Sequence, residues 1–245
     1  NYVYVMCGDG CLMEGITNEA ASLAGTLGLN NLIVLYDDNN ITIDGSTDLT
    51  FTEDVSLRFK SLNWDVFCIE DGDNDIEGVK NTILQAKNCE KPVLIKVKTT
   101  IGYSSMNQGD CKVHGSQLGI EEVKRLREKF GFSDYDMFEF PEELIQNCRE
   151  VINKGKEKEN NWDNKLNIYK NIFPEKYENL KKYFTNSETK CDFLPIYSED
   201  DKKMSTRDLS GKCMEKIVEK MNNLIVGSAD LSSSNKVLFK QPTFN

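Results

Sequence analysis

The sequence lacks the features that mark several large classes of protein. Its longest apolar run, Tyr2 to Cys7, has six residues, whereas a membrane-spanning helix needs about 20, so we expect no membrane contact. No N-terminal segment combines positive charge, an apolar stretch and a cleavage site, so no export signal is predicted. Basic residues are outnumbered, 30 against 40 acidic ones, for a net charge of −10. This balance argues against general binding to nucleic acid.

The sequence also lacks the closely spaced pairs of cysteine or histidine that bind metals. The eight cysteines never form a C-x-x-C pair, and the chain has a single histidine, His114. A zinc module needs short cysteine or histidine pairs, and a disulfide scaffold needs a far higher share of cysteine. The cysteines are therefore predicted to be reduced thiols of a cytoplasmic protein.

The two ends of the sequence indicate that it is a piece of a longer protein. The chain begins at Asn1, without methionine, in residues that resemble a buried strand, and it stops at Asn245 soon after an apolar segment. Its 245 residues suffice for one or two domains.

The first hundred residues alternate between two hydrophobic patterns. Near-continuous apolar runs, typical of strands buried on both faces of a parallel sheet, occupy 2–6, 32–36, 64–69 and 93–97. Segments with helical spacing lie between them, at 20–29, 55–62 and 76–86. Asn74 is placed as the N-cap of the third helix, with Glu77 as its N3 carboxylate. This order predicts an α/β fold, an open and mostly parallel sheet with flanking helices.

The pattern changes beyond about residue 120. Charged amphipathic segments predict helices at 121–130, 142–154, 165–172 and 175–184. The segment 154–164 is predicted to be a solvated turn or an exposed helix that serves as a connector. After Pro195, Ser205 can cap a helix over 208–221, and a short strand is expected at 224–226, as in the opening of a second α/β domain. We place the boundary between 1–172 and 173–245.

Polar residues follow two neighbouring predicted strands. Gly8-Asp9-Gly10 closes the first, and Asn39, thirty residues after Asp9, lies where the next one ends. Open α/β sheets bind ligands at the carboxyl ends of their strands, and carboxylate, amide and main-chain oxygens suit Mg²⁺ or Ca²⁺. Glycines let the backbone approach a phosphate, and the N-terminus of a helix favours its charge. A G-D-G alone is a common tight turn, but the pair predicts a metal-bridged diphosphate site.

The paired motif resembles that of thiamine-diphosphate enzymes, and longer stretches narrow the resemblance to the transketolase family. These stretches are GDGCLMEGI at 8–16, EA at 19–20, LAG at 23–25, YDDN at 36–39, ITIDG at 41–45, KTTIGY at 98–103, VHG at 113–115, STRDLS at 205–210 and GSADL at 227–231. They follow the family's order over essentially the whole chain. The resemblance implies the thiamine-diphosphate-binding fold. Residues 1–172 would form the C-terminal part of the diphosphate-binding (PP) domain with a helical connector, and 173–245 would begin the pyrimidine-binding (Pyr) domain.

The resemblance also implies a set of cofactor contacts. Asp9 and Asn39 would ligate Mg²⁺ or Ca²⁺ through their side chains and Ile41 through its carbonyl. Gly10 and Asn39 would touch the diphosphate of thiamine diphosphate.

Three acidic residues are implied to lie near the cofactor and the subunit interface. They are Glu14, Glu19 and Asp230. On physical grounds alone, the two glutamates could equally be exposed first-turn residues favoured by a helix dipole, and Asp230 could be an ordinary turn residue at a strand end.

Catalysis and substrate binding are implied for three more residues. His114 matches the family's histidine beside the diphosphate and the reacting carbon, where an imidazole can move protons on and off a ketose hydroxyl. Arg207 and Ser234 match the residues that hold the phosphate of the sugar substrate. The implied function is that of a transketolase of the pentose phosphate pathway. It transfers a two-carbon ketol unit from a ketose phosphate to an aldose phosphate through a cofactor-bound carbanion, in a homodimer with its active sites at the interface.

The sequence departs from the family at two places beside the expected sugar channel. Ser104 stands where glycine is usual, and Ser116-Gln117 stand where Ala-Pro is common. The family's other histidines, and the glutamate that protonates the cofactor's pyrimidine ring, lie outside these 245 residues. The chain alone is therefore expected to be inactive.

Three alternatives remain open at this stage. A related enzyme, of the dihydroxyacetone synthase or deoxyxylulose-phosphate synthase type, would share the same cofactor chemistry. A transketolase-like module could bind cofactor or a partner without turnover. A metal-dependent phosphohydrolase with Asp9 as nucleophile is disfavoured, because Gly10 and Cys11 stand where a second acidic group would be needed.

Overall fold

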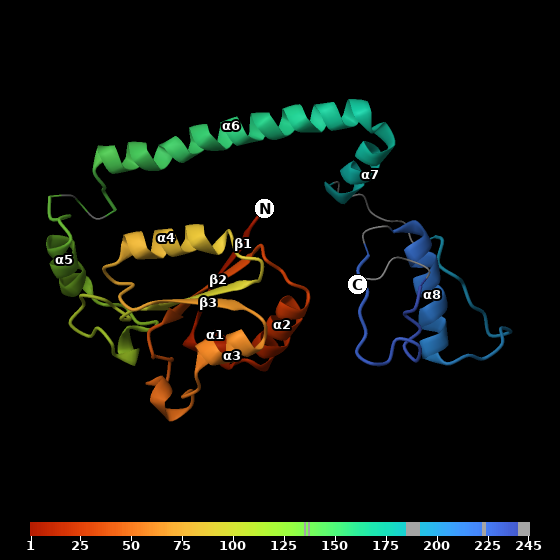
Figure 1. The fold of residues 1–245 in the computed structure, drawn as a ribbon, viewed down its shortest axis with the longest axis horizontal. Coiled ribbons are helices and arrows are strands. Elements are labelled where there is room, and N and C mark those ends of the chain that lie inside the picture. Colours follow the sequence, from red (N-terminus) through yellow and green to blue (C-terminus); the bar gives the residue numbers. More distant parts are fainter. Residues whose placement is uncertain (135, 137, 185–191, 222–223, 240–245) are drawn as a thin grey trace. The chain divides into compact units, whose positions relative to one another are not determined.

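The computed structural model describes residues 1–134, 136, 138–184, 192–221 and 224–239. The chain divides into two compact units, Asn1–Glu142 and Glu143–Asn245. Figure 1 shows the elements of each unit. None of the helices in the described ranges is both long enough and apolar enough to cross a membrane.

A four-stranded parallel sheet forms the centre of the first unit. Its strands are β1 (Val3–Gly8), β2 (Leu32–Asp38), β3 (Asp65–Ile69) and β4 (Val93–Lys98). They lie in the order β1-β2-β4-β3, and all three pairings are parallel. The register sets Gly8 beside Asp37 and Asp38 beside Lys98, so β1, β2 and β4 end at one edge of the sheet. The predicted open parallel α/β sheet is confirmed.

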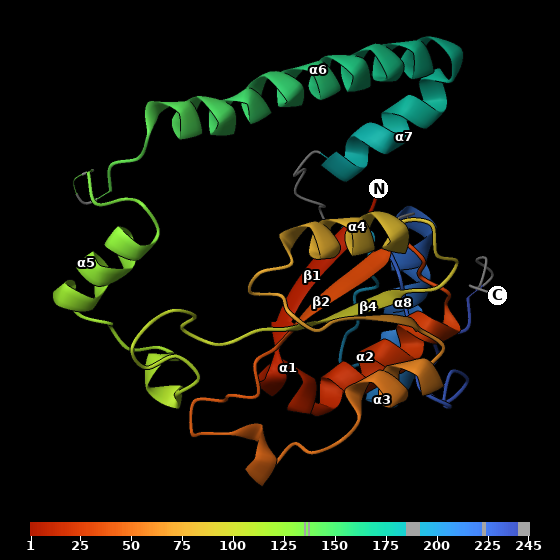
Figure 2. The same cartoon turned by 60° about the vertical axis from the view of Figure 1, so that its left-hand side comes forward.

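Helices cover both faces of this sheet (Figures 1 and 2). They are α1 (Asp9–Met13), α2 (Gly15–Thr26) and α3 (Val55–Ser61) on one face and α4 (Ile76–Ala86) on the other. Because side chains alternate along a strand, β2 contributes to two cores. Val34 and Tyr36 pack with Leu12 and Phe59 under α1–α3, whereas Ile33 packs on the α4 side.

β1 is less buried than its sequence suggests. An apolar run of this kind predicts burial on both faces, yet Val3, Tyr4, Val5 and Met6 are 40–82% exposed. The reason is topological, since β1 is the edge strand of the sheet and pairs only with β2 among the described strands.

Two helix ends differ from the sequence prediction. α2 spans Gly15–Thr26 rather than 20–29, because the chain turns at Gly28, whose φ of 60° suits glycine just beyond a helix. The N-cap of α4 is Asp75, whose Oδ1 accepts a hydrogen bond from the Gly78 backbone N–H at 2.8 Å. Asn74 does not cap this helix. Its side-chain nitrogen donates to the Asp71 carboxylate.

Short elements and one longer helix complete the first unit. They are the 3₁₀ turns η1 (Thr47–Leu49) and η2 (Cys111–Val113) and the helix α5 (Ile120–Lys129). α5 confirms the helix predicted at 121–130. Seven of the eight cysteines lie in the described residues and are free thiols, and Cys191 lies outside them.

The second unit contains three helices in its described part. They are α6 (Glu142–Ile172), α7 (Pro174–Phe184) and α8 (Thr206–Lys220). The segments predicted at 142–154 and 165–172 belong to the single helix α6, so the exposed-helix interpretation of 154–164 is correct. The Ser205 hydroxyl accepts from the Asp208 backbone N–H at 3.1 Å, which confirms the predicted cap of α8.

The strand predicted at 224–226 does not form. A strand is held by hydrogen bonds to a neighbouring strand, and the described part of the second unit contains no other strand to pair with. The predicted boundary at 172/173 stays a prediction, since it falls between α6 and α7 and the two compact units divide earlier, at 142/143.

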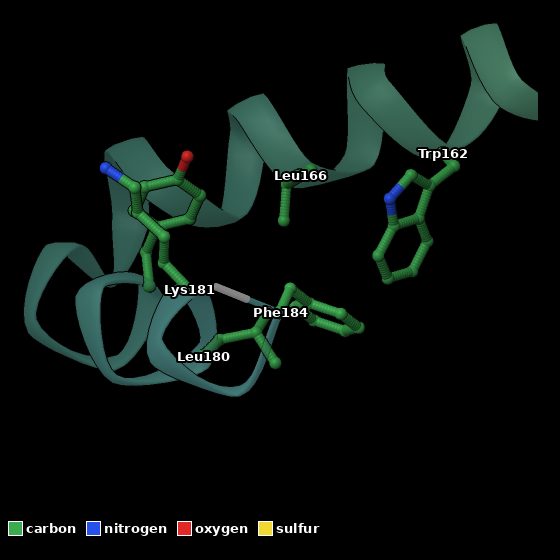
Figure 3. A pocket seen from close by; sticks show the side chains of 6 residues that line it. Trp162, Leu166, Leu180, Lys181 and Phe184 are labelled. Atoms are coloured by element: carbon green, nitrogen blue, oxygen red, sulfur yellow. The ribbon is translucent and has the colours of Figure 1, made fainter. Parts of the chain in front are cut away.

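An apolar cavity of about 340 Å³ lies between α6 and α7. Figure 3 shows Trp162 and Leu166 of α6 facing Leu180 and Phe184 of α7. Their apolar side chains face each other across this cavity, on either side of the turn before Pro174.

Candidate functional site

Asp9 is a buried side chain with three hydrogen-bond donors at the carboxyl edge of the sheet. It opens α1 directly after β1 and is only 2% exposed. The Tyr36 hydroxyl donates to its Oδ1 at 2.6 Å, and the backbone N–H groups of Asn39 and Asn40 donate to its Oδ2 at 3.3 and 3.1 Å. Asp9 and Asn39, thirty residues apart in the sequence, are therefore neighbours in space.

The turn after β2 presents Asn39 in one fixed orientation. Its side-chain nitrogen donates to Asp37 Oδ2 at 3.0 Å, and its Oδ1 accepts from the Ile41 backbone N–H at 3.0 Å. Asn40 has a φ of 60°, in the left-handed region that asparagine tolerates better than most residues. This turn directs two successive amides at Asp9 and leaves a lone pair on the Asn39 amide oxygen.

A cavity of about 790 Å³ opens at this edge of the sheet. The predicted site residues that line it are Asp9, Gly10, Glu14, Asn39, Ile41 and His114. A methyl group added at Gly8 or Gly10 would meet no protein atom within 4 Å. The two glycines thus leave open space beside Asp9, as expected where a ligand approaches the backbone.

The oxygen atoms at this cavity fit a hard divalent cation. Asp9, Asn39 and Ile41 line the same space, and carboxylate, amide and main-chain oxygens suit Mg²⁺ or Ca²⁺. Within the described ranges, no three His, Cys, Asp or Glu side chains are grouped as a metal site. A cation here would therefore depend on neutral oxygens and on ligand phosphate as well as on Asp9.

A charged network behind Asp9, centred on the buried Asp38, was not predicted from the sequence. Asp38 is buried, accepts from the Tyr36 hydroxyl at 3.2 Å, and pairs with Lys96 Nζ at 3.1 Å and Lys98 Nζ at 3.6 Å. Burial lowers the pKa of Lys96, but the hydrogen bond and charge of Asp38 outweigh that effect and raise it. Burial, reinforced by the hydrogen bond to Asp9, raises the pKa of Tyr36. The two-residue alternation of Tyr36 and Asp38 in β2, and of Lys96 and Lys98 in β4, indicates a polar face on each strand, but it does not tell that these residues lie side by side.

The other predicted site residues are not grouped around Asp9 by any described contact. Glu19 is exposed on α2. Arg207 lies in the first turn of α8, and Asp230 and Ser234 lie in turns after it, all three in the second unit. Their roles stay predictions.

The two departures beside the expected sugar channel differ in structure. Ser116 and Gln117 are exposed. Ser104 is buried, has a φ of 69°, and its hydroxyl has no protein partner in the described part of the chain. A serine is strained in this backbone conformation, in which glycine is not.

Ser104→Gly is therefore expected to raise the free energy of unfolding by about 1 kcal/mol. Removing the left-handed serine relieves about 1–2 kcal/mol, and the greater freedom of glycine in the unfolded chain offsets about 0.5–1 kcal/mol. Urea denaturation measures the difference. Ser105→Ala is the matched control, because Ser105 is also buried with an unpartnered hydroxyl but has no positive φ. A gain in Ser105→Ala equal to that in Ser104→Gly would contradict the backbone explanation.

Comparisons with known proteins agree with this fold and cavity. The family model described as "Transketolase, thiamine diphosphate binding domain" matches residues 1–188. Transketolase 1 of Saccharomyces cerevisiae is 43% identical over 248 residues, which covers 98% of this chain and 36% of that protein. The chloroplastic transketolase of Zea mays is 41% identical, again over 98% of this chain and 36% of that protein.

The fold of this chain is also similar to that of a transketolase whose structure has been solved. The crystal structure of transketolase from Pichia stipitis in complex with sedoheptulose-7-phosphate matches this chain with a TM-score of 0.89 and 40% identity. That match covers 98% of this chain and 36% of the crystallised one.

The parallel sheet, the cavity at its carboxyl edge and the family match together define a thiamine diphosphate-binding domain. The chain belongs to the transketolase family. It spans about 36% of the length of the curated relatives described above.

Proposed function

We propose that the full-length protein is a transketolase, which transfers a two-carbon ketol unit from a ketose phosphate to an aldose phosphate. The observation that carries the proposal is the pairing of Asp9 with the turn at Asn39, beside the open space left by Gly8 and Gly10. The relative that was crystallised with sedoheptulose-7-phosphate supports sugar phosphates as the substrates.

In this proposal the cavity at the edge of the sheet holds the diphosphate end of the cofactor. Asp9, Asn39 and the Ile41 carbonyl hold Mg²⁺, or Ca²⁺ in its place, and Gly10 and Asn39 contact the diphosphate. Glu14 lies at the same cavity and contributes to cofactor binding. Bound thiamine diphosphate supplies the electron sink that cleavage of a carbon–carbon bond requires.

His114 is the proposed catalytic residue of this chain. Its side chain is exposed and lines the cavity, where an imidazole can take up and return the proton of a substrate hydroxyl. Arg207 and Ser234 are proposed to bind the substrate phosphate, with the guanidinium providing a planar, permanent charge. Asp230 is proposed to contact the cofactor.

The assembly and setting of the protein follow from the same proposal. We infer a homodimer with each active site at the subunit interface, and Glu19 near that interface. Residues 1–172 would belong to the diphosphate-binding domain with its connector, and 173–245 would begin the pyrimidine-binding domain. The proposed setting is the pentose phosphate pathway in the cytoplasm, although a maize relative is named as chloroplastic.

A coupled assay of the full-length protein tests the proposal. With thiamine diphosphate and Mg²⁺, ketol transfer from sedoheptulose-7-phosphate to an aldose phosphate is expected, and chelation of the metal should abolish it. The 245-residue chain alone is expected to show none. Cofactor binding without turnover in the full-length protein would favour a non-catalytic module, and transfer to formaldehyde alone would favour the dihydroxyacetone synthase type.

A further inference from the structure

A single hydroxyl links two buried carboxylates behind the cavity. Tyr36 is 2% exposed, and its hydroxyl lies 2.6 Å from Asp9 Oδ1 and 3.2 Å from Asp38 Oδ1. A phenol has one proton to donate, and the shorter distance is that of a strong hydrogen bond to a carboxylate. The principal bond of Tyr36 is therefore to Asp9, and Asp38 is a second, weaker acceptor of the same proton.

Asp38 is itself fixed by the neighbouring strand. Its Oδ2 pairs with Lys96 Nζ at 3.1 Å and with Lys98 Nζ at 3.6 Å, and both lysines belong to β4. Because Asp38 is the last residue of β2 and lies beside Lys98 in the sheet register, the network is built on paired strands. Rigid elements of this kind hold a binding group more accurately than loops do.

We infer that Tyr36 is a positioning residue for Asp9 as a metal ligand. This inference rests on the proposed function, in which Asp9 binds Mg²⁺. Tyr36 secures Oδ1, and the amides of Asn39 and Asn40 secure Oδ2, so rotation of the carboxylate breaks hydrogen bonds at both oxygens. The orientation of Asp9 is thus set before a cation arrives.

The choice between Mg²⁺ and Ca²⁺ separates this role from simple core packing. Mg²⁺ demands a near-ideal octahedral arrangement of ligands, whereas Ca²⁺ accepts variable geometry. A carboxylate free to rotate therefore penalises Mg²⁺ more than Ca²⁺. General loosening of the fold would weaken the binding of both cations to the same extent.

Tyr36→Phe in the full-length protein tests the inference, since it removes only the hydroxyl. MgCl₂ or CaCl₂ is titrated into metal-free protein at a fixed concentration of thiamine diphosphate, and binding is followed by calorimetry. We expect about a tenfold loss of Mg²⁺ affinity, as is common for outer partners of metal ligands, and a smaller loss for Ca²⁺. Tyr4→Phe is the matched control, because it removes an exposed hydroxyl from the neighbouring strand β1. Equal losses for both cations, or none, would overturn the inference.

Further variants keep the outcome interpretable. Asp38→Asn changes the same network but leaves the Tyr36 hydroxyl on Asp9, because an amide can donate to the phenolic oxygen where a carboxylate can only accept, so we expect the ratio of Mg²⁺ to Ca²⁺ affinity to stay unchanged. A fall in that ratio equal to the one in Tyr36→Phe would overturn the inference. If Tyr36→Phe does not fold, Tyr36→Met takes its place, since methionine adapts to irregular core space and also lacks the hydroxyl, and an unchanged ratio in that variant would overturn the inference as well. Asp9→Ala separates the proposed function from the positioning role of Tyr36. If it leaves metal affinity intact, the proposed function fails, whereas if it abolishes binding and Tyr36→Phe has no effect, only the positioning role fails.

Discussion

Replacing Asp9 by alanine in the full-length protein is expected to weaken Mg²⁺-dependent binding of thiamine diphosphate by at least about 100-fold, because even outer partners of metal ligands contribute about 10–100-fold. Asp9 provides the only carboxylate of the proposed ligand set, whose other members are the Asn39 amide and the Ile41 carbonyl. The remaining neutral oxygens cannot replace a negative charge for a divalent cation. Calorimetric titration of the cofactor with and without Mg²⁺ measures the effect.

The controls for this experiment follow from the hydrogen bonds of Asp9. Alanine leaves the backbone N–H groups of Asn39 and Asn40 without their acceptor and the Tyr36 hydroxyl with Asp38 alone, and each unsatisfied buried donor costs about 1–3 kcal/mol of stability. The folded state of the variant therefore needs to be checked by circular dichroism. Asp48→Ala removes an exposed carboxylate from η1, in the connection after β2 that also contains Asn39 and Ile41, and should leave cofactor affinity within about threefold. Unchanged affinity in a folded Asp9→Ala variant would refute the metal site.

The sheet could be predicted from the sequence, because burial between helices imposes local hydrophobic patterns. β2 and β4 have such patterns, and both strands are largely buried. β1 has an equally apolar sequence but lies at the edge and is exposed, since the position of a strand in the sheet depends on pairing across the chain. The strand expected at 224–226 failed for a related reason, as hydrophobicity indicates a strand only where a partner strand is present.

The proximity of Asp9 and Asn39 could be predicted from the sequence, whereas the contacts of the residues behind Asp9 could not. Asp9 and Asn39 follow strand ends, and the parallel order of strands brings such ends together. The contacts of Tyr36 and Lys96 depend on which residues of β2 and β4 lie side by side, and that register is set over sixty residues of sequence. Local patterns carry no information about a register of this range, so the charged network behind Asp9 required the structure.

His114→Ala is expected to lower the turnover of the full-length protein by about 100-fold or more, in the range of a lost general acid or base, with cofactor affinity within about threefold. The reason is its position. His114 lines the cavity, follows η2 and is exposed, so its side chain can reach a substrate without supporting the fold. Steady-state kinetics give the turnover, and calorimetry gives the cofactor affinity.

An asparagine variant distinguishes proton transfer at His114 from simple substrate contact. His114→Asn keeps a polar side chain that can form hydrogen bonds but cannot accept a proton as a base, so we expect it to lose about as much turnover as His114→Ala. Lys112→Ala removes a nearby exposed charge from the last turn of η2 and should leave turnover unchanged. If His114→Asn keeps most of the turnover, or if cofactor affinity falls in parallel with turnover, His114 serves binding and another group moves the proton.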